Sequence, residues 1–285
     1  MPTTPLPLPE ITYLFVPASR PDRFAKALDA GADRVIIDLE DAVAPDAKPA
    51  ARAALAQALS AGLPSPAFIR INPKESADFD DDLTMLAGLS EQAVAGVAGI
   101  MLPKCDSPDT VAAVRAAFAI NMPVIALIET ASGVARAADV AAAAGVARLA
   151  LGAADLAVDL DVDVSSPLVD VVYAQLVIAS RVAGLPSPIG SPYFTISDPE
   201  GAEREARRLR SLGVLAQLCI HPRLLTPAVL GFAPSAEQVA WARQLVGTDD
   251  GAATVAGQMV DRPVRERAER ILAWHARTGA GHPTA

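Results

Sequence analysis

The 285-residue sequence has few cysteines, few aromatic residues and no excess of positive charge. Its two cysteines, Cys105 and Cys219, follow apolar runs and match no metal-ligand spacing, which indicates buried, reduced thiols. Aromatic residues make up only 4% of the chain, so a core built from the 52% of hydrophobic residues must consist mainly of Ala, Leu, Val and Ile. The formal net charge of −9 argues against a nucleic-acid or anionic-membrane surface.

Long apolar runs are also missing. No segment approaches the roughly 20 apolar residues that a membrane span requires. The proline-rich start of the chain has neither the basic region nor the apolar core of a secretion signal. We therefore expect a cytoplasmic protein without a membrane partner, with residues 1–10 and 279–285 disordered.

Short apolar segments alternate with helix-like segments along most of the chain. Eight segments have the length of strands: 13–17, 34–38, 67–72, 99–104, 124–128, 148–151, 187–190 and 214–220. The seventh gives the weakest signal. Helices are expected to end near residues 28, 60, 89, 118, 143, 183 and 212, and the stretch after residue 155 reads as a loop that leads to a helix at 167–183.

This alternation predicts an α/β fold with a parallel sheet. Eight strand–helix units fit a closed (β/α)8 TIM barrel, which we assign to residues 11–232. An open doubly wound sheet is the alternative, but no Gly-x-Gly-x-x-Gly follows a strand. Two further helices, at 235–246 and 262–277, are joined by a Gly/Ala/Thr linker and form a C-terminal helical extension over residues 233–278.

Two carboxylates, Glu129 and Asp155, each follow an apolar strand and lie 26 residues apart. If the two strands are parallel neighbours, both acids project from the same end of the sheet. Two hard oxygen ligands suit a Mg²⁺ ion that keeps open positions for water and substrate. The alternative interpretation of either acid alone is a solvated strand end or a helix N-cap.

Arg70 is the most informative cation because it lies inside the apolar sequence Phe-Ile-Arg-Ile, where burial is costly without an acidic partner. Its guanidinium offers two parallel donors and could clamp the carboxylate of a substrate beside the metal. The alternative is a structural ion pair with Glu40 or Asp38, and the two roles can coexist.

Eight short motifs occur in the following order: LFVPASRP (14–21), DLEDAV (38–43), IRIN (69–72), MLPK (101–104), ALIET (126–130), GAAD (152–155), IHP (220–222) and MVDRP (259–263). Together they resemble the citrate lyase β-subunit-like branch of the HpcH/HpaI aldolase family over residues 11–277. The resemblance implies a barrel that assembles as homotrimers or hexamers. It also implies Mg²⁺, with Mn²⁺ as the alternative metal, at Glu129 and Asp155.

The same resemblance assigns the substrate-binding residues. Arg70 matches the arginine that grips a substrate carboxylate, and Glu40 lies in the DLEDAV motif beside it. The backbone amides of Gly152, Ala153 and Ala154 would cradle a 2-oxo acid.

The resemblance also implies a thioester substrate. Asp261 matches a catalytic aspartate that reaches the site from a neighbouring subunit, and Arg20 and Arg23 match a basic region near the phosphates of coenzyme A. The expected activity is that of a Mg²⁺-dependent carbon–carbon lyase that cleaves or forms a β-hydroxyacyl-CoA such as malyl-CoA or citramalyl-CoA.

Three alternatives stay open. The chain could be a citrate lyase β subunit that needs an acyl carrier protein and partner subunits. It could be an aldolase of free hydroxy-oxo acids, although the simpler aldolases lack the Met-Val-Asp arm. It could also be a catalytically silent barrel. Departures from the family pattern leave the substrate open, because Ala154 replaces a common glutamate and Ile189 replaces a common aspartate.

Overall fold

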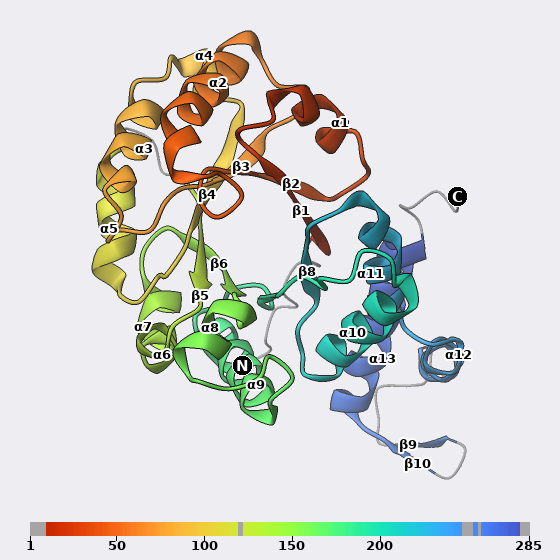
Figure 1. Cartoon of the computed structure of the whole chain (residues 1–285). Helices are drawn as coiled ribbons and strands as arrows, with labels where there is room; N and C mark the ends of the chain where they lie inside the picture. Colours follow the sequence, from red (N-terminus) through yellow and green to blue (C-terminus); the bar gives the residue numbers. More distant parts are fainter. Residues whose placement is uncertain (1–9, 119–121, 247–252, 256–257, 280–285) are drawn as a thin grey trace.

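Eight parallel strands form the centre of the molecule (Figure 1). The computed structural model describes residues 10–118, 122–246, 253–255 and 258–279. Of the ends expected to be disordered, 1–10 and 279–285, it describes only Glu10 and Gly279, and Gly279 is the last residue of a helix, contrary to that prediction. The strands close into a barrel in chain order, which confirms the predicted (β/α)8 fold. They are β1 (Thr12–Pro17), β2 (Arg34–Asp38), β3 (Ala67–Arg70), β4 (Val97–Leu102), β5 (Val124–Ile128), β6 (Val146–Leu151), β7 (Ile189–Gly190) and β8 (Ala216–Cys219).

Helices surround this barrel (Figure 1). They are α1 (Phe24–Leu28), α2 (Lys48–Ala61), α3 (Asp78–Ala87), α4 (Glu91–Val94), α5 (Pro108–Ala116), α6 (Ala131–Ala135), α7 (Ala137–Ala142), α8 (Ala153–Asp159), α9 (Pro167–Val182), α10 (Pro199–Ser211) and α11 (Leu225–Phe232), with short 3-10 turns at Pro21–Arg23, Pro45–Ala47 and Pro222–Leu224. The helices α5, α9 and α10 begin alike, with a side-chain cap followed by proline: Ser107, Ser166 and Asp198 each accept a hydrogen bond from a first-turn amide.

The alternation of side chains along each strand separates two cores. One set of residues fills the barrel interior, including Ile36, Phe68, Leu127 and Ala150. The set that faces outward packs against the helices in a much larger cluster. Because successive strand residues point to opposite faces, the side chain two positions beyond an interior residue points toward the barrel axis as well.

The segments on either side of β6 differ from the sequence prediction. The expected single helix up to residue 143 is two helices, because Arg136 has φ −111° and ψ 12° and leaves the helical conformation between α6 and α7. The stretch after Asp155 begins as helix α8 rather than as a loop. With seven residues, α8 is too short to show a helical period, although it buries Leu156 and Ala157.

The C-terminal extension consists of α12 (Ala236–Leu245), a hairpin of β9 (Ala253–Val255) and β10 (Gln258–Val260), and α13 (Arg262–Gly279). The hairpin lies where the sequence predicted only a linker. Val239, Ala242 and Ile271 form part of a small separate core between α12 and α13. Trp274 fastens α13 to the barrel, since its indole Nε1 donates to the Phe232 carbonyl at 2.7 Å.

Both cysteines are buried and free, as predicted. Burial raises the pKa of the Cys105 and Cys219 thiols to about 12, so neither is poised as a nucleophile. Among the residues that the structure describes, no helix has both the length and the apolar character needed to cross a membrane.

Candidate active site

Four strand ends converge on the mouth of the barrel. Each places a residue two positions beyond an interior side chain: Asp38 after Ile36, Arg70 after Phe68, Glu129 after Leu127 and Gly152 after Ala150. All four therefore face the barrel axis at the carboxyl ends of the strands, where enzymes with this fold have their active sites.

Arg70 is held by carboxylates of the β2 exit. Parallel pairing of β2 and β3 places Asp38 opposite Arg70. The Arg70 Nε and Nη2 atoms donate to the two Asp38 oxygens at 2.7 Å each, and Nη1 lies 2.9 Å from Glu40 Oε2. The Phe15 ring lies 4.8 Å from the guanidinium carbon. Burial alone would lower the pKa of Arg70, but the charge of Asp38 outweighs it and holds the pKa above its ordinary value.

The structural ion pair that the sequence left open is therefore formed. Its hydrogen bonds to Asp38 use two of the five N–H groups of Arg70, and Nη1 pairs with Glu40 by charge without a hydrogen bond to its Oε2. A substrate carboxylate can still be bound by the remaining N–H groups of the guanidinium, so the structural role does not exclude the binding role.

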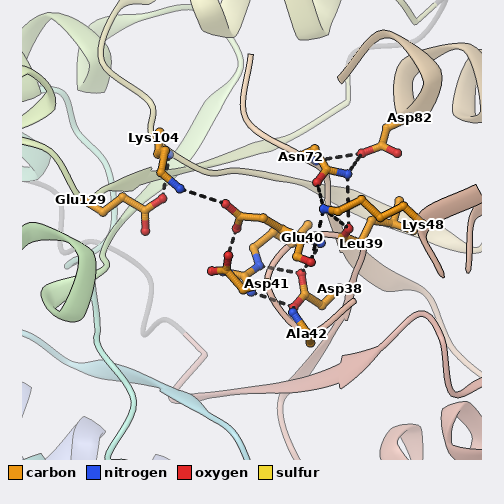
Figure 2. Close-up of polar contacts among 11 residues, drawn as sticks. Asp38, Leu39, Glu40, Asp41, Ala42, Lys48, Asn72, Asp82, Lys104 and Glu129 are labelled. Atoms are coloured by element: carbon orange, nitrogen blue, oxygen red, sulfur yellow. Dashed lines mark hydrogen bonds and ion pairs between the residues drawn. The ribbon is translucent and has the colours of Figure 1, made fainter. Parts of the chain in front are cut away.

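Glu40 is a buried carboxylate, and only one of its two oxygens accepts a hydrogen bond. Its Oε1 accepts a hydrogen bond from Lys104 Nζ at 3.3 Å, as Figure 2 shows. Its Oε2 is buried and accepts no hydrogen bond, although Arg70 is near. Burial raises the pKa of Glu40 to about 7, against the opposing charge of Arg70.

Glu129 is 2% exposed and held by the backbone of the β4 exit. The Lys104 amide donates to Glu129 Oε1 at 2.8 Å (Figure 2). To do so, Lys104 adopts φ 46°, a left-handed conformation that is unusual for a residue with a side chain. Burial, with the negative charge of Glu40, raises the pKa of Glu129 to about 8.

Asp155 lies in the first turn of α8, directly after β6, and is exposed. It is close enough to Glu129 and Lys104 to influence the pKa of each electrostatically. Beside it, Gly152 contacts the Glu129 carboxylate. A Cβ atom at Gly152 would lie 2.3 Å from Glu129 Oε2, so only glycine leaves space for the observed carboxylate position.

The charges at this mouth fit a divalent cation. Five carboxylates gather around Arg70 and Lys104: Asp38, Glu40, Asp41, Glu129 and Asp155. Arg70 and Lys104 do not fully balance this negative charge. One Glu40 oxygen accepts no hydrogen bond, and the pKa of the buried Glu129 is raised. Within the described residues no three His, Cys, Asp or Glu side chains form a metal cage. A site with two carboxylate ligands would be typical of Mg²⁺.

Gly152→Ala is expected to weaken Mg²⁺ binding by about 10–100-fold, because the new methyl group displaces the Glu129 carboxylate. Isothermal titration with Mg²⁺, or Mn²⁺ binding followed by electron paramagnetic resonance, measures the change. Gly88→Ala is the matched control, because its Cβ would meet Thr84 O at an ordinary 3.4 Å. Equal metal affinity in both variants would contradict the assigned geometry.

Only some of the backbone amides predicted to bind the 2-oxo acid are free of other hydrogen bonds in the barrel and its helix. The Gly152 amide donates to the Ile128 carbonyl at 3.0 Å, and the Ala153 amide donates to Ser191 Oγ at 2.6 Å. The amides of Ala154 and Asp155 belong to the first turn of α8, where no helical carbonyl can reach them. The helix therefore supplies no partner to these two amides, which leaves them available to a ligand.

The predicted coenzyme A contacts lie at the β1 exit. Arg20 precedes the 3-10 turn Pro21–Arg23, and both arginines are exposed. Arg20 is paired with Asp22 through two hydrogen bonds of 2.8 and 2.9 Å. An ion pair this exposed contributes little stability, so an incoming phosphate can compete for Arg20.

Asp261 lies away from this mouth. It follows β10, and its Oδ1 caps α13 by accepting a hydrogen bond from the Val264 amide at 3.2 Å. Figure 1 shows the β9–β10 hairpin on the far side of α10 and α13 from β5 and β6. Its catalytic role in a neighbouring subunit stays a prediction.

Lys48, by contrast, belongs to none of the eight sequence motifs. It stands at the start of α2, where a lysine usually belongs to a solvated helix face. Only the packing of α2 against the β2 and β3 exits buries it below the Asp38–Glu40 turn.

Comparison with known proteins agrees with this geometry. Residues 12–222 match the HpcH/HpaI aldolase/citrate lyase family. A citrate lyase subunit beta-like protein of Mycobacterium tuberculosis is 38% identical over 270 residues, which cover 91% of this chain and 93% of the relative. An L-malyl-CoA/beta-methylmalyl-CoA lyase of Cereibacter sphaeroides is 31% identical and covers 93% and 94% of the two chains.

A solved structure is also similar to this chain. The crystal structure of the Mycobacterium tuberculosis protein CitE in complex with magnesium, acetoacetate and coenzyme A has a TM-score of 0.82 and 35% sequence identity to this chain. The match covers 94% of this chain and 98% of that protein. With a closed eight-stranded barrel and two acidic strand ends at its mouth, the chain belongs to the HpcH/HpaI aldolase/citrate lyase family, a family of magnesium-dependent lyases.

Proposed function

We propose that the protein is a Mg²⁺-dependent carbon–carbon lyase that cleaves or forms a β-hydroxyacyl-CoA thioester, with an acyl-CoA and a 2-oxo acid as the other side of the reaction. One observation carries this proposal. The buried Glu129 and the exposed Asp155 lie at the barrel mouth that also holds Arg70, so a metal held by the two acids would share one site with a carboxylate-binding cation.

Glu129 and Asp155 would hold the metal. When bound, Mg²⁺ supplies a Lewis acid that polarises the oxo group and orients the substrate. The position of the Glu129 carboxylate supports this role. The Lys104 amide donates to it and Gly152 leaves space for it, so it is held in place before a ligand binds.

Arg70 and the first turn of α8 would bind the oxo-acid half. The free N–H groups of Arg70 face its carboxylate, and the amides of Ala154 and Asp155 donate to its oxygens. Ala154 stands where many relatives carry glutamate, which removes one negative charge next to the metal. We infer that this position tunes the choice of acyl or oxo-acid group.

Asp261 would perform the proton transfer. In condensation its carboxylate takes a proton from the carbon next to the thioester carbonyl. In cleavage the protonated acid returns that proton to the acyl-CoA enolate left by the broken carbon–carbon bond. Arg20 and Arg23 would attract the coenzyme A phosphates at the β1 exit despite the acidic net charge.

Because Asp261 lies away from its own barrel mouth, it would act on a neighbouring subunit of a homotrimer or hexamer. An exposed apolar face on α9 and the preceding segment supports self-association. On α9 the helical period places Leu168, Val171, Ile178 and Val182 on one side, and Val158 and Val164 precede them; each is at least 43% exposed.

A coupled assay with a panel of β-hydroxyacyl-CoA thioesters tests the function. We expect the purified chain to release a 2-oxo acid from at least one of them, with activity lost in EDTA and restored by Mg²⁺. Turnover of free hydroxy-oxo acids alone would favour the aldolase. Turnover only of a substrate carried by an acyl carrier protein would favour the citrate lyase β subunit. No metal-dependent cleavage or condensation of any thioester would overturn the proposal.

A further inference from the structure

A buried ammonium group lies directly beneath the turn that carries Asp38 and Glu40. Lys48, the first residue of α2, is 9% exposed. Its Nζ donates to the carbonyl oxygens of Leu39 at 3.2 Å and of Glu40 at 3.4 Å, and also to Asn72 Oδ1, as Figure 2 shows. These three acceptors use all the donors of the ammonium group.

Each of these two carbonyl groups also has one other donor, Asn72 Nδ2 at 3.2 Å for Leu39 and the Val43 amide at 3.0 Å for Glu40. β2 ends at Asp38, so pairing with the neighbouring strands no longer supplies N–H donors to all the carbonyl groups of the turn that follows. The Leu39 amide still bonds to the Arg70 carbonyl at 2.9 Å, but the Leu39 carbonyl turns toward Lys48 and Asn72. Lys48 adds a charged donor to both carbonyl groups and connects them to α2, which fixes the direction in which this turn faces.

A chain of hydrogen-bonded and ion-paired side chains connects Lys48, on α2, with the β3 exit and with α3. Asn72 Nδ2 donates to the Leu39 carbonyl at 3.2 Å and to Asp82 Oδ2 at 2.7 Å. Asp82, on α3, also accepts the Asn72 amide at 2.8 Å and pairs with Arg52 at 3.2 Å. Arg52 stands one turn after Lys48 on α2, so the network closes on itself and ties α2, α3 and the β3 exit together.

The same turn presents the acids that hold Arg70. Asp38 folds the turn by accepting the amides of Glu40 at 2.9 Å and Ala42 at 3.1 Å while it pairs with Arg70. Lys48 fixes the carbonyl of Glu40 on one side of the turn, and the carboxylate of Glu40 faces Arg70 and Lys104 on the other. A rotation of this turn therefore moves the partners of Arg70.

We propose that Lys48 is a positioning residue, which orients the Asp38–Glu40 turn and through it the guanidinium of Arg70 that receives the substrate carboxylate. The inference rests on the proposed function for its catalytic meaning. Lys48 contacts none of the residues assigned to the metal, so it controls the grip on the oxo-acid half and leaves metal binding alone.

The test compares Lys48→Met with Lys74→Met. Both remove one positive charge from a side chain of similar length, but Lys74 is exposed after β3. In Lys48→Met, we expect amide hydrogen exchange in residues 38–43 to rise by about tenfold or more, while exchange in 124–130 stays at the wild-type level. Lys74→Met should change neither segment.

Substrate and metal affinity provide a second measurement. A purely structural role of Lys48 would not weaken one of these affinities and spare the other. In Lys48→Met, KM for the substrate that turns over is expected to rise about tenfold or more, with Mn²⁺ affinity within about twofold of wild type. Lys48→Arg keeps charged donors at this position and is expected to restore part of the exchange protection and of the KM. Equal losses of substrate and metal affinity would overturn the inference.

The two proposals fail separately. If the wild-type chain turns over no thioester, the proposed function falls, but exchange in residues 38–43 still reports on Lys48. If Lys48→Met leaves that exchange unchanged, or raises it equally throughout the barrel, the positioning role is wrong whatever the activity of the wild type.

Discussion

Glu129→Gln is expected to abolish Mg²⁺ binding at micromolar metal and to lower kcat/KM of the lyase reaction by about a thousandfold or more. The proposed site uses two carboxylate ligands from the protein, Glu129 and Asp155, and the amide that replaces Glu129 keeps its shape but not its charge. Loss of a Lewis acid is worth several kcal/mol of transition-state stabilisation, and each 1.4 kcal/mol or so is about tenfold in rate. Isothermal titration and steady-state kinetics at saturating Mg²⁺ measure the two effects.

Glu91→Gln is the control for this variant, because Glu91 is an exposed carboxylate on α4. It should bind Mg²⁺ and turn over substrate as the wild type does. A Glu129→Gln protein that retains wild-type metal affinity would show that the metal, if bound, lies elsewhere.

The same variant should not lose stability in the absence of metal. The pKa of Glu129 is raised from 4.5 to about 8, so the folded protein keeps a proton on this group that the unfolded chain releases. Unfolding thus becomes easier as pH rises from about 4.5 to 8, and Glu129→Gln lacks this contribution. Thermal melts in EDTA at pH 5 and pH 8 should show a smaller decrease for the variant, which separates ligand loss from misfolding.

Asp261→Asn is expected to lower kcat by about 10²–10⁴-fold while the melting temperature and Mg²⁺ affinity stay at wild-type values. Asparagine is as good an N-cap as aspartate, so the hydrogen bond from the Val264 amide and helix α13 are retained. Only the carboxylate needed for proton transfer is lost. Steady-state kinetics in both reaction directions, with thermal melts beside them, measure the change.

A mixture of two inactive variants tests the delivery of Asp261 from a neighbouring subunit. Co-refolded or co-expressed Asp261→Asn and Glu129→Gln chains combine an intact metal site with an intact acid when the two groups come from different subunits. Random mixing in a ring should then restore activity to about a quarter of the sites. If Asp261 acts within its own chain, no site has both groups and activity stays at the level of the separate variants. If Asp261→Asn alone is fully active, the proton is transferred by another group.

Local patterns in the sequence were sufficient to predict the barrel and the position of its acids. Strand-length apolar segments alternate with helical ones, and the two-residue period of a strand places Glu129 on the interior face beyond Leu127. Neighbouring parallel strands bring Gly152 beside Glu129, with Asp155 one helical turn further on. The chain order and the strand period are enough to place Glu129 and Asp155 at the same end of the sheet, whereas the position of Gly152 directly beside Glu129 depends on the β5–β6 register.

The partners of the buried charges were decided by the tertiary structure. The sequence left Arg70 between two roles, and the β2–β3 register settled its pairing with Asp38, 32 residues away. Lys104 reaches Glu40 across 64 residues, and Lys48 reaches Asn72 across 24.

Such pairs depend on how far each strand is shifted against its neighbour and on where each helix docks. A residue's own neighbours in the chain do not encode either quantity. The sequence thus determined which groups stand at the barrel mouth, and the tertiary structure decided which of them hold one another and which N–H groups are left for a ligand, because burial makes every unpaired charge costly.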